Sequence, residues 1–263
     1  GNLTNPHELV DIIAARGGSA AGPGALAETS TDTALVTALL GSHPHTSIED
    51  AAVDDLALLR GALSLVFANE TTLFAARDPQ GIRPLVLGRL ERGWVVASET
   101  AALDIVGASV VREVEPGELV VVDDGGLRSR RFAPAEPKGC LFEFVYFARP
   151  DTTLQGQTIH GTRQEMGRRL ATQAETHADI TVPVPESGIP AAQGFSEVSG
   201  IPYTDGLIKN RYVGRTFIQP AQAMRERGVR FQPALGGTLS LGRTNPFFLG
   251  GGHNFAIHHQ GGG

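Results

Sequence analysis

The spacing of apolar residues changes twice along the chain, and this change restricts the possible folds more than any other feature. Up to about residue 60, apolar residues recur at helical spacing. We predict a first helix over 8–16, stopped by a Gly-Gly pair, and a second over 34–40 behind Thr31 and Asp32. A third is predicted over 47–59, with acidic residues in its first turns. The chain therefore begins as a helical layer.

From Gly61 onward the sequence changes to short β-type runs separated by turn sequences such as Asp-Pro-Gln-Gly and Asp-Asp-Gly-Gly. Consecutive short strands with tight turns favour an antiparallel sheet, with the preceding helices packed on one face. We therefore predict an α+β domain over residues 1–135. The predicted strands are 62–67, 72–76, 84–89, 94–98 and 118–123.

The second change follows a linker predicted at 134–138 (Pro-Ala-Glu-Pro-Lys). Beyond it, a helix over 161–177, a strand over 180–184 and a helix over 189–199 alternate, which is the pattern of a parallel α/β sheet. A second, partial domain is predicted over 136–230. The tail, 231–263, is rich in glycine. Apart from histidines, its sequence contains one charged residue, Arg243. It shows no amphipathic period.

Charge and cysteine content exclude several classes of protein. The formal net charge is −6, so the composition does not indicate general nucleic-acid binding. We find no apolar run of transmembrane length and no signal-peptide pattern. The single cysteine, Cys140, excludes an intrachain disulfide framework and fits a reducing compartment. The expected location is the cytoplasm.

Three segments carry a specific resemblance. They are Gly1–Asn5 (GNLTN), Arg77–Leu85 (RDPQGIRPL) with 97–100 (ASET), and Lys209–Ile218 (KNRYVGRTFI). In this order, and over about residues 1–230, the chain resembles the amidophosphoribosyltransferases. The resemblance implies an N-terminal-nucleophile (Ntn) glutaminase domain, an α/β/β/α sandwich, followed by part of a phosphoribosyltransferase domain with a parallel sheet.

The resemblance also implies a reaction. The family releases ammonia from glutamine with a terminal cysteine and transfers it to phosphoribosyl pyrophosphate (PRPP), which is held with Mg²⁺. The products are 5-phosphoribosylamine, glutamate and pyrophosphate, in the first committed step of purine biosynthesis. Family members are usually homo-oligomers that purine nucleotides inhibit. The expected ligands are therefore glutamine, PRPP and purine nucleotides.

Two residues match the family's glutamine site. Gly1 corresponds to a glycine whose N–H helps to form the oxyanion hole, which stabilises charge developing on the glutamine carbonyl oxygen. The competing interpretation of Gly1 is a frayed terminus. Asp32 corresponds to the carboxylate that holds the α-amino group of glutamine through charge-assisted hydrogen bonds. Asp32 would also serve simply as a helix N-cap, and the two roles are compatible.

The predicted PRPP loop places three cations within seven residues. Lys209, Arg211 and Arg215 alternate with Tyr212 and Gly214, between apolar flanks that suit a loop anchored at both ends. In the family such a loop closes over PRPP, excludes water and neutralises charge on the leaving pyrophosphate. The alternative is a solvated charged face.

Other candidate residues have simpler interpretations. We expect Arg77, Asp78 and Arg83 to have a structural role, as a buried ion pair around a turn. Cys140 matches a ligand of a [4Fe–4S] cluster in one branch of the family, but a cluster needs four ligands and the chain has one cysteine. The alternative for Cys140 is a small, buried apolar side chain. The segment 186–188 (Glu-Ser-Gly) is predicted to be a strand-end turn near the sugar-phosphate site.

The sequence also departs from the family pattern. It has neither the terminal cysteine nor the diacidic PRPP motif, and Asp123-Asp124 belongs to a predicted hairpin turn instead. We therefore expect this chain alone not to hydrolyse glutamine. One alternative is a non-catalytic relative that keeps the fold. Another is a different glutaminase-coupled enzyme, against which the Lys209–Ile218 segment argues. Three histidines in the tail, at 253, 258 and 259, are a poor metal site, because no acid or thiol accompanies them.

Overall fold

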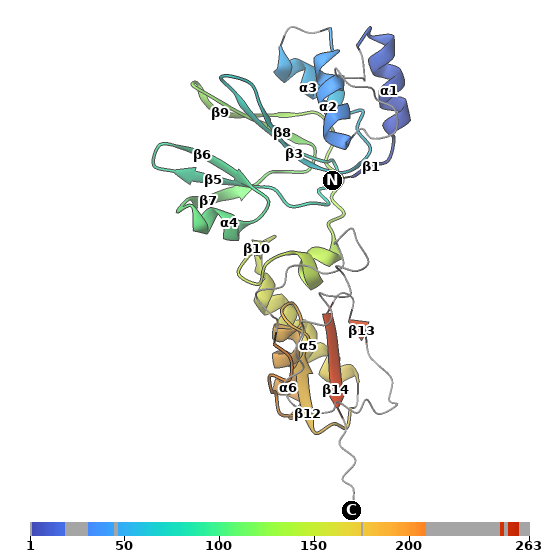
Figure 1. Cartoon of the computed structure of the whole chain (residues 1–263). Helices are drawn as coiled ribbons and strands as arrows, with labels where there is room; N and C mark the ends of the chain where they lie inside the picture. The colour runs from blue at the N-terminus through green and yellow to red at the C-terminus, as the bar shows by residue number, and fades with distance from the viewer. Residues whose placement is uncertain are drawn as a thin grey trace, which may run out of the picture. The chain divides into compact units, whose positions relative to one another are not determined.

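The computed structural model describes residues 2–18, 31–44, 47–174, 176–208, 248–249 and 252–257. The chain divides into two compact units, Gly1–Cys140 and Leu141–Gly263 (Figure 1). The segment predicted as a linker is hydrogen-bonded to the first unit, because the N–H groups of Glu136 and Lys138 donate to Pro79 O and Gln80 O. The domain boundary at 135 stays a prediction.

Unit 1 begins with a short strand and three helices, as the helical spacing predicts. Strand β1 (Asn2–Leu3) leads into α1 (Pro6–Ala15), α2 (Asp32–Gly41) and α3 (Ile48–Leu56). Thr31 caps α2 by accepting a hydrogen bond from Ala34 N, and Ser47 caps α3 by accepting one from Asp50 N. The remaining elements are β2 (Gly61–Ala62), β3 (Ser64–Ala68), β4 (Leu73–Arg77), β5 (Val86–Leu90), β6 (Gly93–Ala97), α4 (Thr100–Ile105), β7 (Ser109–Glu113), β8 (Glu118–Asp123) and β9 (Gly126–Arg131).

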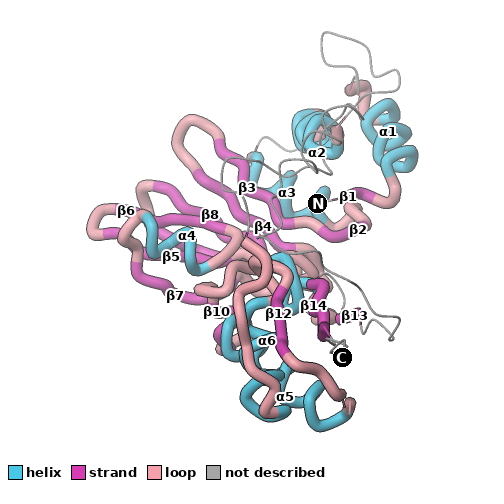
Figure 2. Tube along the Cα trace, turned by 60° about the horizontal axis from the view of Figure 1, so that its bottom comes forward, coloured by secondary structure: helices cyan, strands magenta, loops and turns pink. Residues whose placement is uncertain are grey.

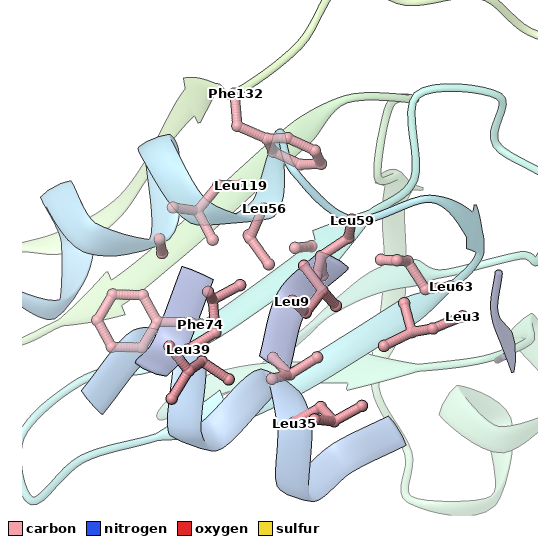
Figure 3. Packing of buried hydrophobic residues seen from close by; sticks show 14 of the residues in the cluster. Leu3, Leu9, Leu35, Leu39, Leu56, Leu59, Leu63, Phe74, Leu119 and Phe132 are labelled. Atoms are coloured by element: carbon pink, nitrogen blue, oxygen red, sulfur yellow. The ribbon is translucent and has the colours of Figure 1, made fainter. Parts of the chain in front are cut away.

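Seven of these strands form two antiparallel sheets, ordered β3-β4-β8-β9 and β6-β5-β7 (Figure 1 and Figure 2). The alternation of side chains in β4 and β8 produces the layers. Phe74 and Leu119 point toward α1–α3 and join the largest core cluster (Figure 3). Ala75 and Val120, from the opposite face, pack with Leu87 of the other sheet.

The outer face of the second sheet is covered by α4. Val86 of β5 packs with Leu103 of α4 and with Ala108, all buried. Unit 1 is therefore a four-layer α/β/β/α sandwich with α1–α3 on one side and α4 on the other. This confirms the predicted fold class.

Two Arg–Glu pairs join the sheets of the sandwich. Arg77 at the end of β4 reaches Glu113 of β7, with Nη1 3.3 Å from Oε2. Arg112 of β7 donates two hydrogen bonds, of 2.8 and 2.6 Å, to the carboxylate of Glu118 in β8. Both carboxylates lie next to the short connection between β7 and β8, which passes from one sheet to the other.

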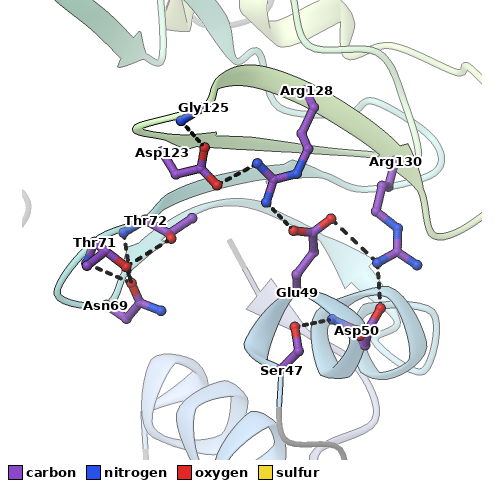
Figure 4. Close-up of polar contacts among 10 residues, drawn as sticks. All are labelled: Ser47, Glu49, Asp50, Asn69, Thr71, Thr72, Asp123, Gly125, Arg128 and Arg130. Atoms are coloured by element: carbon purple, nitrogen blue, oxygen red, sulfur yellow. Dashed lines mark hydrogen bonds and ion pairs between the residues drawn. The ribbon is translucent and has the colours of Figure 1, made fainter.

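The helical layer is also held to the first sheet by surface ion pairs (Figure 4). Glu49 and Asp50, in the first turn of α3, contact Arg128 and Arg130 of β9. Arg128 also contacts Asp123, whose Oδ1 accepts a hydrogen bond from Gly125 N across the β8–β9 turn. The Asp-Asp-Gly-Gly sequence is therefore a hairpin turn, as predicted.

Unit 2 contains a π-helical turn η1 (Glu143–Phe147), a small hairpin of β10 (Thr153–Leu154) and β11 (Gln157–Thr158), α5 (Ile159–Gln173), β12 (Ile180–Pro183), α6 (Ile189–Ser199), β13 (Phe248–Leu249) and β14 (Gly252–Ile257). Helices α5 and α6 pack backbone to backbone at Gly167 and Gly194. A Cβ on Gly167 would lie 1.9 Å from Ala191 O, and one on Gly194 would lie 2.0 Å from Gln164 O. Only glycine permits this approach.

The strand pairing of unit 2 differs in part from the sequence prediction. A parallel contact does follow α6, because Thr181 of β12 forms a parallel bridge with Tyr203. In the described part of the chain, however, the longer ladder of β12 is antiparallel, with β14 from the glycine-rich tail. The tail has no strand period in its sequence, so this pairing could not be predicted.

Candidate functional site

Asp32 occupies the first residue of α2, where the helix dipole favours a carboxylate. The N-cap role belongs to Thr31, so the simple capping interpretation of Asp32 is wrong. The half-buried side chain of Asp32 accepts a hydrogen bond at Oδ2 from the backbone N–H of Leu3, at 2.9 Å. The carboxylate is thus fixed against β1, 29 residues earlier in the chain.

Strand β1 is held by a short antiparallel ladder. Asn2 and Leu3 pair with Ala62 and Gly61 of β2, and Thr4 N donates to Arg60 O at 2.8 Å. The Leu3 side chain is buried in the main core cluster (Figure 3). The predicted oxyanion-hole residue, Gly1, lies outside the described residues. Leu3, two positions later in the chain, contacts the predicted ammonium-binding carboxylate.

The Arg77–Gly81 turn is structural, as predicted, but its two charged side chains serve different partners. Arg77 is buried and donates to three carbonyl oxygens, those of Gly81, Arg83 and Val114, at 2.8–3.0 Å. Its acidic partner is Glu113 rather than Asp78. This corrects the predicted Arg–Asp pair.

Asp78 is completely buried and accepts hydrogen bonds from the backbone N–H groups of Leu63, Gln80 and Ile82. It therefore shapes the turn itself. Together, Arg77 and Asp78 fix the corner where β4 passes toward the second sheet. Nothing in their surroundings indicates chemistry.

The predicted PRPP-loop residues, Lys209, Arg211, Tyr212, Gly214 and Arg215, lie outside the described residues. The chain leading to them is described as far as Ile208. It runs beside β12, where Thr181 N donates to Pro202 O at 2.8 Å and Thr204 N donates to Thr181 O at 3.0 Å. Burial and a hydrogen bond to Asp205 raise the pKa of Tyr203 to about 12, so its hydroxyl stays protonated.

The Glu-Ser-Gly segment lies in the turn between β12 and α6, with Gly188 immediately before the helix. The predicted strand-end turn is confirmed. Its proximity to a sugar-phosphate site stays a prediction.

Cys140 is a free, half-buried thiol at the end of unit 1. Among the residues that the structure describes, no group of three His, Cys, Asp or Glu side chains is placed to hold a metal ion. In the same residues no helix has the length and apolar character needed to cross a membrane.

The role of Asn5 was not predicted from the sequence. Asn5 lies in the Gly1–Asn5 motif, but its position before a helix with proline at the first turn indicates only an N-cap. In the structure it makes no capping hydrogen bond. Its side chain is instead bonded to Leu58 and Arg60, more than fifty residues away.

Comparisons with known proteins agree with this geometry. Residues 1–105 match the glutamine amidotransferase domain model. The part of the sandwich from β1 to α4, with the Asp32–Leu3 contact, thus lies in a segment that matches the glutamine amidotransferase domain.

Most of the chain is similar to one group of enzymes. It is 54% identical over 233 residues to the amidophosphoribosyltransferase of Mycobacterium leprae, covering 88% of this chain and 42% of the relative. It is 42% identical to the Bacillus subtilis enzyme, covering 88% of this chain and 48% of the relative. The chain spans somewhat less than half the length of these relatives. Over the matched residues the chain is homologous to the amidophosphoribosyltransferases.

Solved structures give the same result. The glutamine PRPP amidotransferase from B. subtilis, complexed with ADP and GMP, matches with a TM-score of 0.77 and 42% identity, over 90% of this chain and 51% of that one. The allosteric regulatory enzyme of purine biosynthesis matches with a TM-score of 0.74 and 42% identity, over 88% and 48%. The family resemblance seen in the sequence is confirmed.

Proposed function

We propose that the protein containing this chain is a glutamine-dependent amidophosphoribosyltransferase. It converts glutamine, PRPP and water to 5-phosphoribosylamine, glutamate and pyrophosphate, as the first committed step of purine biosynthesis. The observation that carries the proposal is the hydrogen bond from Leu3 N to Asp32. It joins the family's ammonium-binding carboxylate to the strand that follows its oxyanion glycine.

In unit 1 we assign glutamine binding to Asp32 and Gly1. Leu3 holds Oδ2 of Asp32, and the second oxygen, Oδ1, receives the ammonium group of glutamine. The N–H of Gly1 stabilises charge that develops on the carbonyl oxygen of the side-chain amide. The family's nucleophile is a terminal cysteine, which these 263 residues do not include. Cys140 is not assigned that role.

We assign PRPP binding to the second domain, 136–230, and in particular to the loop residues Lys209, Arg211, Tyr212, Gly214 and Arg215. The positive charges of Lys209, Arg211 and Arg215 neutralise negative charge on the pyrophosphate that leaves when ammonia attacks the ribose carbon. Mg²⁺ enters as the counter-ion of PRPP, since Mg²⁺ is commonly bound through substrate phosphates and few protein carboxylates. The first domain, 1–135, then supplies ammonia, and no role is assigned to 231–263.

Regulation and location follow from the family. We propose that purine nucleotides inhibit the enzyme, that it acts as a homo-oligomer and that it is cytoplasmic. An iron–sulfur cluster does not fit the residues present, because one cysteine supplies one of four ligands. Cys140 would contribute to a cluster only alongside three cysteines from other sequence.

The test uses the full-length protein. With glutamine, PRPP and Mg²⁺ together, glutamate and pyrophosphate should appear in equal amounts, and omission of PRPP should abolish pyrophosphate release. A folded full-length protein that releases neither product would be a non-catalytic relative. Glutamate release without any PRPP-dependent pyrophosphate would indicate a different glutaminase-coupled enzyme.

A further inference from the structure

Asn5 connects the candidate glutamine site to a distant part of unit 1. It lies between β1 and α1 and is 8% exposed. A buried carboxamide must satisfy both its donor and its acceptor, since an unpaired polar group would cost free energy. The partners of Asn5 therefore reveal what its side chain fixes in place.

The carboxamide of Asn5 forms the two hydrogen bonds that a backbone peptide group forms in a β-ladder, one as donor and one as acceptor. Its Nδ2 donates to Leu58 O at 3.0 Å, and its Oδ1 accepts from Arg60 N at 3.1 Å. The amide also donates to Glu8 in the first turn of α1, at 3.1 Å. The carboxamide thus continues the β1–β2 ladder beyond Thr4, whose backbone N–H donates to Arg60 O.

This extended ladder fixes the register of β1. The main-chain pairs Leu3–Gly61 and Thr4–Arg60 lie directly beside the two Asn5 bonds. A strand of two residues has few hydrogen bonds of its own, so each additional bond is a large share of what holds it. The same strand carries the N–H of Leu3 that holds Asp32.

We propose that Asn5 is a positioning residue for glutamine: its carboxamide locks β1 in register, and β1 in turn aims the Asp32 carboxylate at the ammonium group of the substrate. This inference rests on the proposed function. Asn5 itself does not touch glutamine. Its loss should loosen the site without affecting the transfer of ammonia to PRPP.

The test compares Asn5→Ala with Asn69→Ala in the full-length enzyme. Asn69 is a matched control, since its carboxamide also organises backbone, accepting hydrogen bonds from Thr71 and Thr72 N–H in the β3–β4 turn (Figure 4). Asn5→Ala loses three hydrogen bonds, and loss of the two that hold β1 in register, to Leu58 O and Arg60 N, predicts a rise of about tenfold in the glutamine KM. Activity with free ammonium in place of glutamine should be unchanged, and Asn69→Ala should match wild type in both assays.

A second variant, Asn5→Asp, covers the case in which Asn5→Ala does not fold. An ionised carboxylate still accepts from Arg60 N, but it repels Leu58 O and Glu8, so the glutamine KM should rise. Protonation restores an O–H donor, and the carboxyl should take up a proton readily beside these oxygens. Lowering the pH should therefore return its glutamine KM toward the wild-type value measured at the same pH.

The outcomes separate this inference from the proposed function. An unchanged glutamine KM in the Asn5 variants, or an equal fall in glutamine- and ammonium-driven activity, would overturn the role of Asn5. If wild-type enzyme forms no phosphoribosylamine from either nitrogen source, the proposed function itself fails.

Discussion

At the residue scale, the proposed glutamine site depends on the carboxylate of Asp32. Replacing it with asparagine keeps the shape and the acceptor for Leu3 N–H but removes the negative charge. A charge-assisted hydrogen bond contributes about 1.5–3 kcal/mol, so kcat/KM for glutamine should fall by about 10- to 150-fold. Steady-state assays of the full-length enzyme would measure this. Asp50→Asn, an exposed acid on α3, is the control, and equal behaviour of the two variants would contradict the assignment.

A second residue-scale prediction concerns Asp55, which is completely buried on α3. Its Oδ1 lies 2.8 Å from Nη2 of Arg16, after α1, and 3.7 Å from Nε2 of His43, after α2. Removing one partner of a buried ion pair costs about 3–5 kcal/mol. Asp55→Ala should therefore lower the free energy of unfolding by about 3 kcal/mol in urea titrations.

The control for Asp55 is Glu115→Gln, which breaks an exposed pair with Arg131 and should change stability little. If Asp55→Ala were as stable as this control, the buried cluster would not hold the three helices together.

Several individual residues were predictable because their roles are local. Thr31 and Ser47 cap helices as the sequence indicates, and Asp123 starts a hairpin turn. Asn5 was not predictable, because its partners lie 53 and 55 residues further along the chain. Nor does the sequence reveal that Arg77 pairs with Glu113 rather than its neighbour Asp78. Long-range partners depend on topology, which local pattern does not specify.

At the scale of elements, the approach of α5 and α6 makes Gly167 sensitive to substitution. A methyl group there would lie 1.9 Å from Ala191 O, so the helices would have to separate. Gly167→Ala should lower the stability of the chain by about 1–3 kcal/mol or more. Thermal unfolding would measure this against Gly41→Ala, where a Cβ meets nothing within 4 Å. Gly41→Ala should be neutral or slightly stabilising, and equal effects would contradict the close packing.

The Arg112–Glu118 pair between the sheets predicts a specific response to acid. Burial alone would raise the pKa of Glu118, but hydrogen bonds from Arg112 and from Glu115 N–H outweigh burial and hold the pKa below the ordinary 4.5. A lowered carboxyl pKa stabilises the fold above about pH 4.5, and this stabilisation is lost as the pH falls through the folded-state pKa. Wild type should thus exceed Glu118→Gln in unfolding free energy at pH 7.

Urea titrations at several pH values would measure this difference, which should shrink as the pH falls below 4.5. A difference that is constant with pH would show that the charge of Glu118 does not contribute.

Elements with a strong apolar period were predictable, whereas edge strands with a polar sequence or exposed apolar side chains were not. Helices α1–α3 and strands β3–β6 and β8 were predicted within a few residues, whereas the short helix α4 was not predicted. Strand β9 was missed because its sequence, GLRSRR, is mostly polar, and its arginines contact the acids of α3. Strand β7 lies at the edge of its sheet with Val110 and Val111 exposed. The turn η1 has a π-helical pattern, which sequence periodicity does not indicate.

At the scale of the whole molecule, the proposed reaction carries nitrogen from glutamine to the ribose of PRPP. The most direct measurement supplies the full-length enzyme with glutamine labelled with ¹⁵N in the side-chain amide, together with PRPP and Mg²⁺. We predict that the label appears in 5-phosphoribosylamine in proportion to the pyrophosphate released. Label found only as free ammonium, with PRPP unconsumed, would show that the enzyme does not transfer nitrogen from glutamine to PRPP.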